Sequence, residues 1–419
     1  MQGKIDTLPR RWRRFSESAR VLLRDPLARE AWWNNFLKEL SYTHAQVRSL
    51  GRPQVFEIET TNRCPFACVM CPRTYAMTRP VGDMDIGLFR ELIDQMHPAW
   101  QMDKPGGRPL VRLLHYGEPF VYRHFAESIQ HCHRRGFQVL LSSNPAVWTE
   151  HRIQQALDTG VDEIMAMVDG MDDETSTAIR GSAAGYARAE ANIRRLAELK
   201  VKRGSRSPYL VLAMIKQPRN AHQWELFTHY WKGIEGIDGT YLAHYSVFDG
   251  SIRDINRIND TLMKRDSSQA EQYARQLRLS RFPCYYPWHS VAVTWSGEVV
   301  PCCRDYNCTL VLGDLNRQSL HQIWNGSLIR HLRRAFIRGR RDNNLCRHCV
   351  EASLEIGLPG RHYAPASFLR RRGYGKMHQM GSSPGIDERS WSTPQNLSGG
   401  GYKRQAIPAR QEEEEPVAV

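Results

Sequence analysis

The feature that most constrains this chain is a loop with three cysteines in eight residues, Cys64, Cys68 and Cys71, spaced C-x3-C-x2-C. The loop follows an apolar, strand-like run at 55–60. Cysteine thiolates select zinc, copper(I) or iron–sulfur clusters. A structural zinc needs four closed ligands, and the residues after Cys71 offer no further Cys or His close by. Three thiolates on one tight loop therefore indicate an iron–sulfur cluster with one iron left open.

Together with the preceding segment at 55–62, this motif resembles that of the radical S-adenosylmethionine (SAM) enzyme family. The resemblance implies that the open iron of a [4Fe–4S] cluster binds the amino and carboxylate groups of SAM. An electron from the cluster then cleaves SAM to a 5′-deoxyadenosyl radical, which abstracts hydrogen from an unactivated C–H bond. The alternative is a set of chance or zinc-binding cysteines.

Composition supports a folded protein with metal sites. The chain has 419 residues, 41% of them hydrophobic, enough for a barrel-sized domain plus a smaller one. No run of about 18 uncharged apolar residues occurs, and no signal peptide opens the chain, so we expect a cytoplasmic protein without a membrane span. In that reducing compartment its ten cysteines are metal ligands sooner than disulfides. The net charge of +14 is spread along the chain, which favours a solvated surface over a nucleic-acid footprint.

From 55 to 245, strand-like and helix-like runs alternate, which is typical of parallel strands joined by helical crossovers. The expected strands are 55–60, 110–115, 137–142, 163–168, 209–215 and 240–245. The expected helices are 86–97, 121–135, 149–159, 172–200 with a break near Gly181, and 221–232. This α/β pattern resembles the partial (β/α)6 TIM-like barrel of the radical SAM core. The cysteine loop follows the first strand, so it lies at the mouth where such barrels place their active sites.

Further motifs at the strand ends resemble the SAM-binding elements of the family. Tyr116, Gly117 and Glu118 stand where the family carries the GGEP element that holds the SAM amino group, with Tyr116 in place of a glycine. Arg180 aligns with the arginine that reaches the SAM carboxylate, a task that suits a bidentate guanidinium. Polar groups at the end of the third strand are also expected to face the cofactor or the substrate. They belong to Ser143 and Asn144.

A second cysteine set lies near the C-terminus. Cys284 and Cys302 flank a predicted hairpin that turns at Gly297, and Cys346 and Cys349 form a distant C-x2-C. A hairpin brings its ends together, so four thiolates could close a second [4Fe–4S] cluster. The pattern resembles the SPASM auxiliary-cluster domain in its one-cluster twitch form. A four-thiolate zinc site is the alternative.

Two cysteines remain near that set, and one lies far from it. Cys303 could replace Cys302 as a ligand, could be inert, or could donate hydrogen to a substrate radical; Cys308 has no assigned role. Cys132 falls on a predicted core helix, where we expect only packing.

We expect five segments. Residues 1–50 form an amphipathic helical segment, 51–250 the barrel, 251–283 a bridging region, 284–358 a small α+β twitch/SPASM domain, and 359–419 a mostly disordered tail. The first segment carries apolar residues at mostly helical spacing and is expected to pack on the barrel as a lid; a membrane-surface or peptide-binding element is the alternative. The apolar residues are Leu22, Leu23, Leu27, Trp32, Trp33, Phe36, Leu37 and Leu40.

The expected activity is radical chemistry on a small sugar-like or cyclitol substrate, by oxidation or epimerisation. The single auxiliary cluster resembles that of aminocyclitol dehydrogenases in the family, and the first 50 residues are short for a peptide-recognition domain. A reducing partner such as flavodoxin or ferredoxin is implied. The alternatives are maturation of a ribosomal peptide, modification of RNA docked on the basic termini, or a non-catalytic zinc-binding scaffold.

Overall fold

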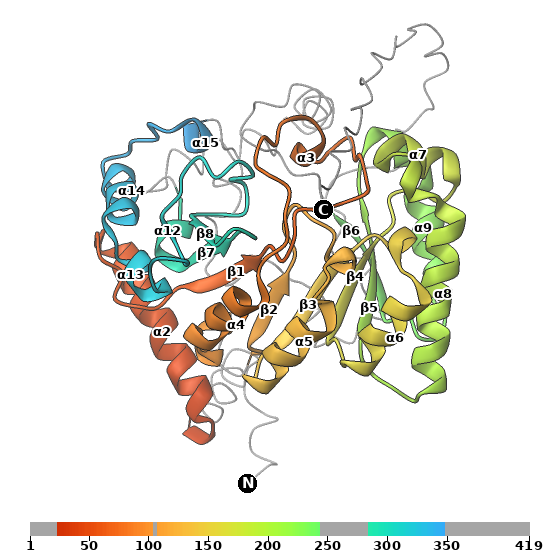
Figure 1. Ribbon diagram of the computed structural model, residues 1–419, viewed down its shortest axis with the longest axis horizontal. Coiled ribbons are helices and arrows are strands. Elements are labelled where there is room, and N and C mark those ends of the chain that lie inside the picture. The colour runs from red at the N-terminus through yellow and green to blue at the C-terminus, as the bar shows by residue number, and fades with distance from the viewer. Residues whose placement is uncertain (1–22, 104–106, 244–283, 348–419) are drawn as a thin grey trace, which may run out of the picture. The chain divides into compact units, whose positions relative to one another are not determined.

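The computed structural model describes residues 23–103, 107–243 and 284–347 (Figure 1). They share one nine-stranded sheet in the order β6-β5-β4-β3-β2-β1-β7-β8-β9. Strands β1 to β6 are parallel to their neighbours, and β7 runs parallel to β1 on its other side. Strands β8 and β9 then continue the sheet in antiparallel pairing. The expectations for the bridging region, for Cys349 and for the tail lie outside the described residues.

The six barrel strands agree closely with the sequence prediction, and the hairpin of the second cysteine region is also present. The bounds are β1 (Gln54–Ile58), β2 (Leu110–Leu113), β3 (Gln138–Ser143), β4 (Glu163–Met167), β5 (Tyr209–Ile215), β6 (Gly239–Ala243), β7 (Ser290–Val293), β8 (Glu298–Val300) and β9 (Gly313–Asp314). The hairpin turns at Gly297, whose φ of 92° favours glycine. The mostly parallel sheet confirms the α/β prediction.

Helices connect the parallel strands and lie against the sheet (Figure 1). Those of the barrel part are α3 (Pro72–Tyr75), α4 (Ile86–Gln95), α5 (Phe125–Arg134), α6 (Glu150–Asp158), α7 (Asp173–Arg180), α8 (Tyr186–Lys202) and α9 (Trp224–Trp231), with short 3-10 turns between them. The expected break at Gly181 is present, since its φ of 86° ends α7. In the described part of the chain, no helix is long and apolar enough to cross a membrane.

The core lies between the helices and one face of the sheet. Alternate strand residues such as Val111 and Leu113 are fully or almost fully buried there against Phe89 of α4 and Ile129 of α5. Because successive strand residues point to opposite faces, the residues between them face the inner side of the parallel sheet. Cys132 is buried in this core, as expected.

The C-terminal region is continuous with the barrel sheet, which the sequence did not indicate. Its helices are α12 (Tyr286–His289), α13 (Leu320–Trp324), α14 (Ser327–Ile337) and α15 (Asn344–Arg347). A capping box between Ser319 and Gln322 starts α13. Buried Trp324 donates from Nε1 to the carbonyl of Gly51, 2.7 Å away. The region is therefore tied both to β1 and to the segment that precedes it.

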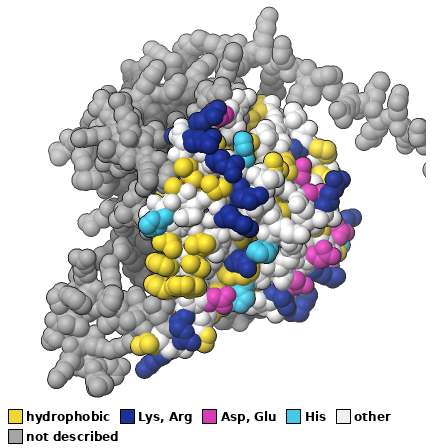
Figure 2. Space-filling model, turned by 90° about the vertical axis from the view of Figure 1, so that its left-hand side faces the viewer, with side chains coloured by type: hydrophobic (Ala, Val, Ile, Leu, Met, Phe, Trp, Pro, Cys, Tyr) yellow, Lys and Arg dark blue, Asp and Glu magenta, His cyan; other side chains and the backbone are white. Residues whose placement is uncertain are grey.

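Helix α2 (Pro26–Thr43) packs on the 3-10 turn at Pro98–Gln101 and on α12, but not through the expected face. Trp32, Trp33 and Phe36 stack on one another and are 44%, 54% and 42% exposed. These three aromatic residues therefore lie outside the packed face of α2, whereas Leu27 packs against Ala99 and Met102. The face that carries α2 and α14 shows a group of hydrophobic side chains beside a band of Lys and Arg (Figure 2).

The buried face of α2 is made of small and polar residues. Asn34 exchanges hydrogen bonds with the backbone of Arg52, at 2.6 Å and 3.2 Å. A Cβ on Gly51 would lie 2.6 Å from Cγ of Lys38, so the segment at 51 comes very close to the helix. Small side chains allow that approach, and the large aromatic residues remain outside.

Lys38 provides a test of this packing, because burial lowers its pKa from 10.5 to about 8 and Asp103 offsets only part of the effect. The unfolded chain binds the proton more tightly, so the folded state is destabilised below about pH 8 and this cost disappears as pH rises toward 10.5. We predict that Lys38→Met raises the free energy of unfolding at pH 7 by up to about 3 kcal/mol. The gain over wild type should shrink in denaturant melts at higher pH.

The matched control is Lys202→Met, which changes an exposed lysine at the end of α8. It should leave stability nearly unchanged at both pH values. A loss of stability in Lys38→Met at pH 7 would contradict the assignment of Lys38 as a buried, destabilising charge.

Candidate functional site

The cysteine loop is held against the end of α7. The backbone N–H of Ala67 donates to the carbonyl of Arg180 at 3.0 Å, and that of Val69 donates to Ile179 at 2.8 Å. Gly181 follows in a conformation that favours glycine, and a Cβ there would lie 3.2 Å from Cβ of Ala67. Residues far apart in sequence therefore form one loop-and-helix unit.

The three thiols of this loop are close enough to influence one another. Cys68 is buried and the other two are partly buried. Burial raises the pKa of Cys64 and Cys71 to about 12, and Cys68 adds to both shifts. Without metal the thiols hold their protons at neutral pH, so metal binding must release them.

Arg180 reaches the same loop from α7. Its Nη1 lies 3.7 Å from Sγ of Cys68, and its Nε and Nη2 donate to Oδ2 of Asp169 at 2.6 Å and 2.5 Å. Burial opposes the charged guanidinium, but Asp169 and Cys68 outweigh it and raise the pKa of Arg180. Asp169 in turn accepts from the N–H of Ile215 at 2.7 Å. A fixed positive charge thus faces the thiols.

The Gly-Glu-Pro turn after β2 packs against the start of the cysteine loop. A Cβ on Gly117 would lie 1.8 Å from the carbonyl oxygen of Thr61, so the position accepts only glycine. The next N–H, that of Glu118, donates to the carbonyl of Arg63 at 2.9 Å. The turn and the start of the cysteine loop are therefore in direct contact.

Glu118 is buried and accepts three hydrogen bonds. They come from Oγ of Ser143 at 2.6 Å and from the N–H groups of Asn144 and Phe120 at 3.0 Å and 3.1 Å. Burial nevertheless raises the pKa of this carboxyl to about 7. The structure thus brings Ser143 and Asn144 to Glu118, and a cationic amine beside it would favour its ionised form.

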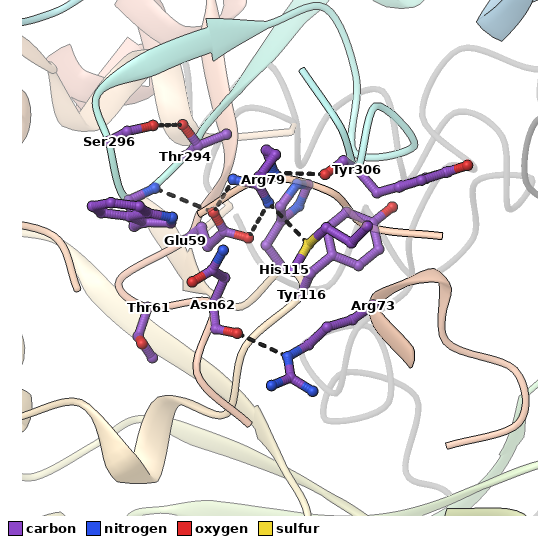
Figure 3. A network of polar contacts seen from close by, with 12 residues as sticks. Glu59, Thr61, Asn62, Arg73, Arg79, His115, Tyr116, Thr294, Ser296 and Tyr306 are labelled. Atoms are coloured by element: carbon purple, nitrogen blue, oxygen red, sulfur yellow. Dashed lines mark hydrogen bonds and ion pairs between the residues drawn. The ribbon is translucent and has the colours of Figure 1, made fainter. Parts of the chain in front are cut away.

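Tyr116, expected at the SAM site, points its side chain toward the second cysteine region. Its hydroxyl donates to the carbonyl of Cys303 at 2.7 Å. Its ring packs edge-on against Tyr306, which Figure 3 shows nearby. Burial raises the pKa of Tyr116, and the thiols of Cys303 and Cys71 add to the shift. One side chain therefore lies between the two cysteine regions. Backbone contact with SAM stays a prediction.

A buried ion pair joins the same two regions. Arg79, downstream of the cysteine loop, binds both carboxylate oxygens of Glu59 at 2.9 Å and 2.8 Å (Figure 3). Its Nε donates to the carbonyl of Tyr306 at 2.6 Å, and the N–H of Thr78 donates to Oδ1 of Asn307 at 2.8 Å. Sequence reasoning missed this pair. Its only signal in the sequence is Glu59, a carboxylate that directly follows the apolar strand β1.

In the second region, the structure brings Cys284 and Cys346 to one apolar cluster. Both pack, partly buried, against Trp288, Leu332 and Phe336. Distant parts of the sequence therefore meet at this cluster.

The remaining cysteines of this region follow the hairpin. Cys302 and Cys303 come directly after β8 and Pro301 and are partly buried. Cys308, with a φ of 54°, lies near Arg79 and Glu298. Cys349 lies outside the described residues, so its part in a second cluster stays a prediction.

The donors present suit the group that the cysteine loop implies. Soft thiols lie on one loop, a guanidinium faces them, and a buried carboxylate lies within electrostatic range of Cys64. Across the described ranges, no three His, Cys, Asp or Glu side chains converge closely enough to hold a single metal ion.

Comparison with known families matches two separate parts of the chain. The family model of the Radical SAM superfamily matches residues 58–220. The family model of the SPASM iron–sulfur cluster-binding domain matches residues 284–350.

Several known proteins are similar to the chain. A tungsten-containing aldehyde ferredoxin oxidoreductase cofactor-modifying protein of Pyrococcus furiosus is 25% identical over 71% of this chain and 86% of its own. An S-adenosyl-L-methionine-dependent 2-deoxy-scyllo-inosamine dehydrogenase of Niallia circulans is 19% identical over 72% of this chain and 94% of its own. The solved structure of Streptococcus suis SuiB bound to the precursor peptide SuiA has the same fold, with a TM-score of 0.50, 14% identity, and coverage of 72% and 70% of the two chains.

Glu118 gives a direct test of the site. We predict that Glu118→Gln weakens SAM binding to the anaerobically reconstituted protein about 10- to 100-fold, because a charge-assisted hydrogen bond contributes roughly 1.5–3 kcal/mol. Wild-type affinity should also fall as pH drops through about 7, where the carboxyl takes up a proton, whereas the variant should lack this dependence. The control Glu198→Gln changes an exposed carboxylate of α8. Equal affinity in Glu118→Gln and wild type would refute the role.

Proposed function

Since this chain belongs to the radical SAM superfamily and carries a SPASM domain, we propose that it oxidises a small cyclitol-like or sugar-like molecule at a carbon bearing a hydroxyl group. The family brings SAM and a [4Fe–4S] cluster as cofactors, and the SPASM domain brings auxiliary iron–sulfur binding. When bound, these groups supply a carbon-centred radical by reductive cleavage of SAM and an acceptor for one electron.

The observation that carries the proposal is the position of Tyr116 between the two cysteine regions. Its hydroxyl binds the carbonyl of Cys303, and Cys71 on the first loop is close enough to add to the rise in the pKa of Tyr116. An oxidation needs an electron acceptor near the site of hydrogen abstraction, and this packing brings the second region to the first. The name of the Niallia circulans relative, a dehydrogenase of an aminocyclitol, supports the same reaction class.

We assign the residues of the chain as follows. Cys64, Cys68 and Cys71 bind the first cluster. Gly117 and Glu118 receive the amino group of SAM, with the carboxylate of Glu118 oriented by its three hydrogen bonds. Ser143 and Asn144 orient that carboxylate, and Arg180 offers its guanidinium to the SAM carboxylate.

The auxiliary cluster is assigned to Cys284, Cys302, Cys346 and Cys349. Support comes from the apolar cluster that Cys284 and Cys346 share and from the position of Cys302 at the end of the hairpin.

The test is an anaerobic reaction with 2-deoxy-scyllo-inosamine deuterated at its ring carbons. We predict deuterium in 5′-deoxyadenosine, one ketone formed for each SAM consumed, and no solvent hydrogen gained at carbon. Neither deuterium transfer nor a ketone, in an enzyme that does cleave SAM, would refute the proposed substrate class.

Two cysteine variants separate the roles of the clusters. Cys346→Ser should still cleave SAM and abstract deuterium, but should form at least about tenfold less ketone, because the electron acceptor is lost. Cys308→Ser removes a neighbouring thiol that is not assigned to a cluster and should behave like wild type. Full ketone formation by Cys346→Ser would contradict an auxiliary cluster as electron acceptor.

Epimerisation is the second candidate, and the position of Cys303 favours it. Its backbone binds Tyr116 and its thiol is close enough to affect the pKa of that residue. A thiol there could return a hydrogen atom to a substrate radical. Solvent deuterium at carbon in the product, lost in Cys303→Ala, would select epimerisation over oxidation. A peptide or an RNA substrate stays a prediction.

A further inference from the structure

We propose that His115, oriented by Glu57, is the base that accepts the hydroxyl proton of the substrate. The inference rests on the proposed oxidation and names a catalytic residue for it. It starts from a buried pair on β1 and at the end of β2 that no part of the cofactor site uses.

The two side chains form a close, buried contact. Nδ1 of His115 lies 2.8 Å from Oε2 of Glu57, and the side chains are 1% and 9% exposed. The second ring nitrogen, Nε2, is also buried, and it has no hydrogen-bond partner among the residues that the structure describes. Leaving a buried polar atom without a partner costs about 1–3 kcal/mol. Such an atom needs an explanation, and a bound substrate group would supply its missing partner.

The pair lies on the inner side of the parallel sheet. Glu57 is in register with Ala292, which alternates with the core residues Val291 and Val293. Residues in register share a face, so Glu57 points away from the helix-covered core. His115 lies just beyond β2, with only Leu114 between them, at the carboxyl end where parallel barrels place catalytic groups.

The pair also adjoins the residue that connects the two cysteine regions. The ring of His115 lies edge-on to that of Tyr116, with centroids 4.3 Å apart. Tyr116 responds electrostatically to both Glu57 and Cys71. Figure 3 shows His115 and Tyr116 side by side, next to Arg79. The proton acceptor, the first cluster loop and the second cysteine region therefore meet around one tyrosine.

The contact with Glu57 orients the ring for this role. A carboxylate only accepts hydrogen bonds, so it holds the proton on Nδ1 and leaves the lone pair of Nε2 available. The same division of roles operates wherever a carboxylate orients a histidine base.

Two other histidine–carboxylate pairs are less enclosed. His131 with Asp94 and His133 with Asp162 are pairs whose side chains are 12% to 49% exposed. The pair of His115 and Glu57 is more deeply buried than these two, and it also lies beside Tyr116.

The proposed step balances in atoms and electrons. Hydrogen abstraction leaves an unpaired electron on the carbon that bears the hydroxyl group. The O–H bond then breaks: its proton goes to Nε2 of His115, the oxygen forms a C=O double bond, and one electron leaves for the oxidised auxiliary cluster. The proton later passes from His115 to water.

The first test uses His115→Gln in the full reconstituted enzyme with the ring-deuterated 2-deoxy-scyllo-inosamine. Deuterium should still reach 5′-deoxyadenosine at the wild-type rate, while ketone formation should fall about 100-fold or more, as expected for loss of a general base. Glu57→Gln should show the same split with a smaller loss. His131→Gln, at a partly exposed pair, is the control and should match wild type.

The outcomes separate this inference from the proposed function. If wild type forms the ketone and His115→Gln forms it equally fast, only the inference fails. If wild type forms no ketone, the proposed function fails and the inference falls with it. If both the His115 and the Glu57 variants lose SAM cleavage as well, the pair is structural and the inference is overturned.

The second test needs no turnover. The reconstituted enzyme is treated with diethyl pyrocarbonate, which modifies unprotonated imidazole, and the modified histidines are identified by peptide mass mapping. Because Nε2 of His115 is buried, opening of the site must expose it, so His115 should react more slowly than His131. The added aminocyclitol should slow the modification of His115 further, at least about threefold, while His131 reacts unchanged. No modification of His115, or no protection, would overturn the inference, because a base must be reachable by the substrate.

Discussion

The backbone pairing between the cysteine loop and the end of α7 is the contact on which the rest of the site depends. Two N–H groups of the loop, at Ala67 and Val69, donate to the carbonyls of Arg180 and Ile179. These bonds fix the loop that carries the three thiols. They also place the guanidinium of Arg180 beside the thiol of Cys68. The loop could not take this position without Gly181, whose conformation ends the helix.

A second constraint joins the two cysteine regions into one structure. Strand β7 pairs with β1, so the hairpin of the second region extends the same sheet that carries the first loop. Arg79, which is paired with Glu59, also donates to the carbonyl of Tyr306. This contact links the first region to the loop that follows β8. These contacts hold the two regions together directly. Electron transfer and substrate chemistry can share a site on this basis.

Much of the fold could be predicted from the sequence, because buried parallel strands are continuous apolar runs and the helices between them have clear periods. The residues around the cysteines could be found because Gly117, Glu118 and Arg180 belong to recognisable motifs. Which face of α2 is buried could not be predicted, because this depends on how closely Gly51 approaches Lys38 in the folded chain. The pair of His115 and Glu57 was also hidden, because a contact between neighbouring strands leaves no local pattern.

We propose that one cluster site is open to SAM and that protein thiolates close a second. Electron paramagnetic resonance of the reduced, fully reconstituted enzyme tests it most directly. Two [4Fe–4S] signals are expected, and addition of SAM should change the g-values of one signal while leaving the other unchanged. A protein that holds zinc in place of iron, or two signals that are both insensitive to SAM, would contradict the account.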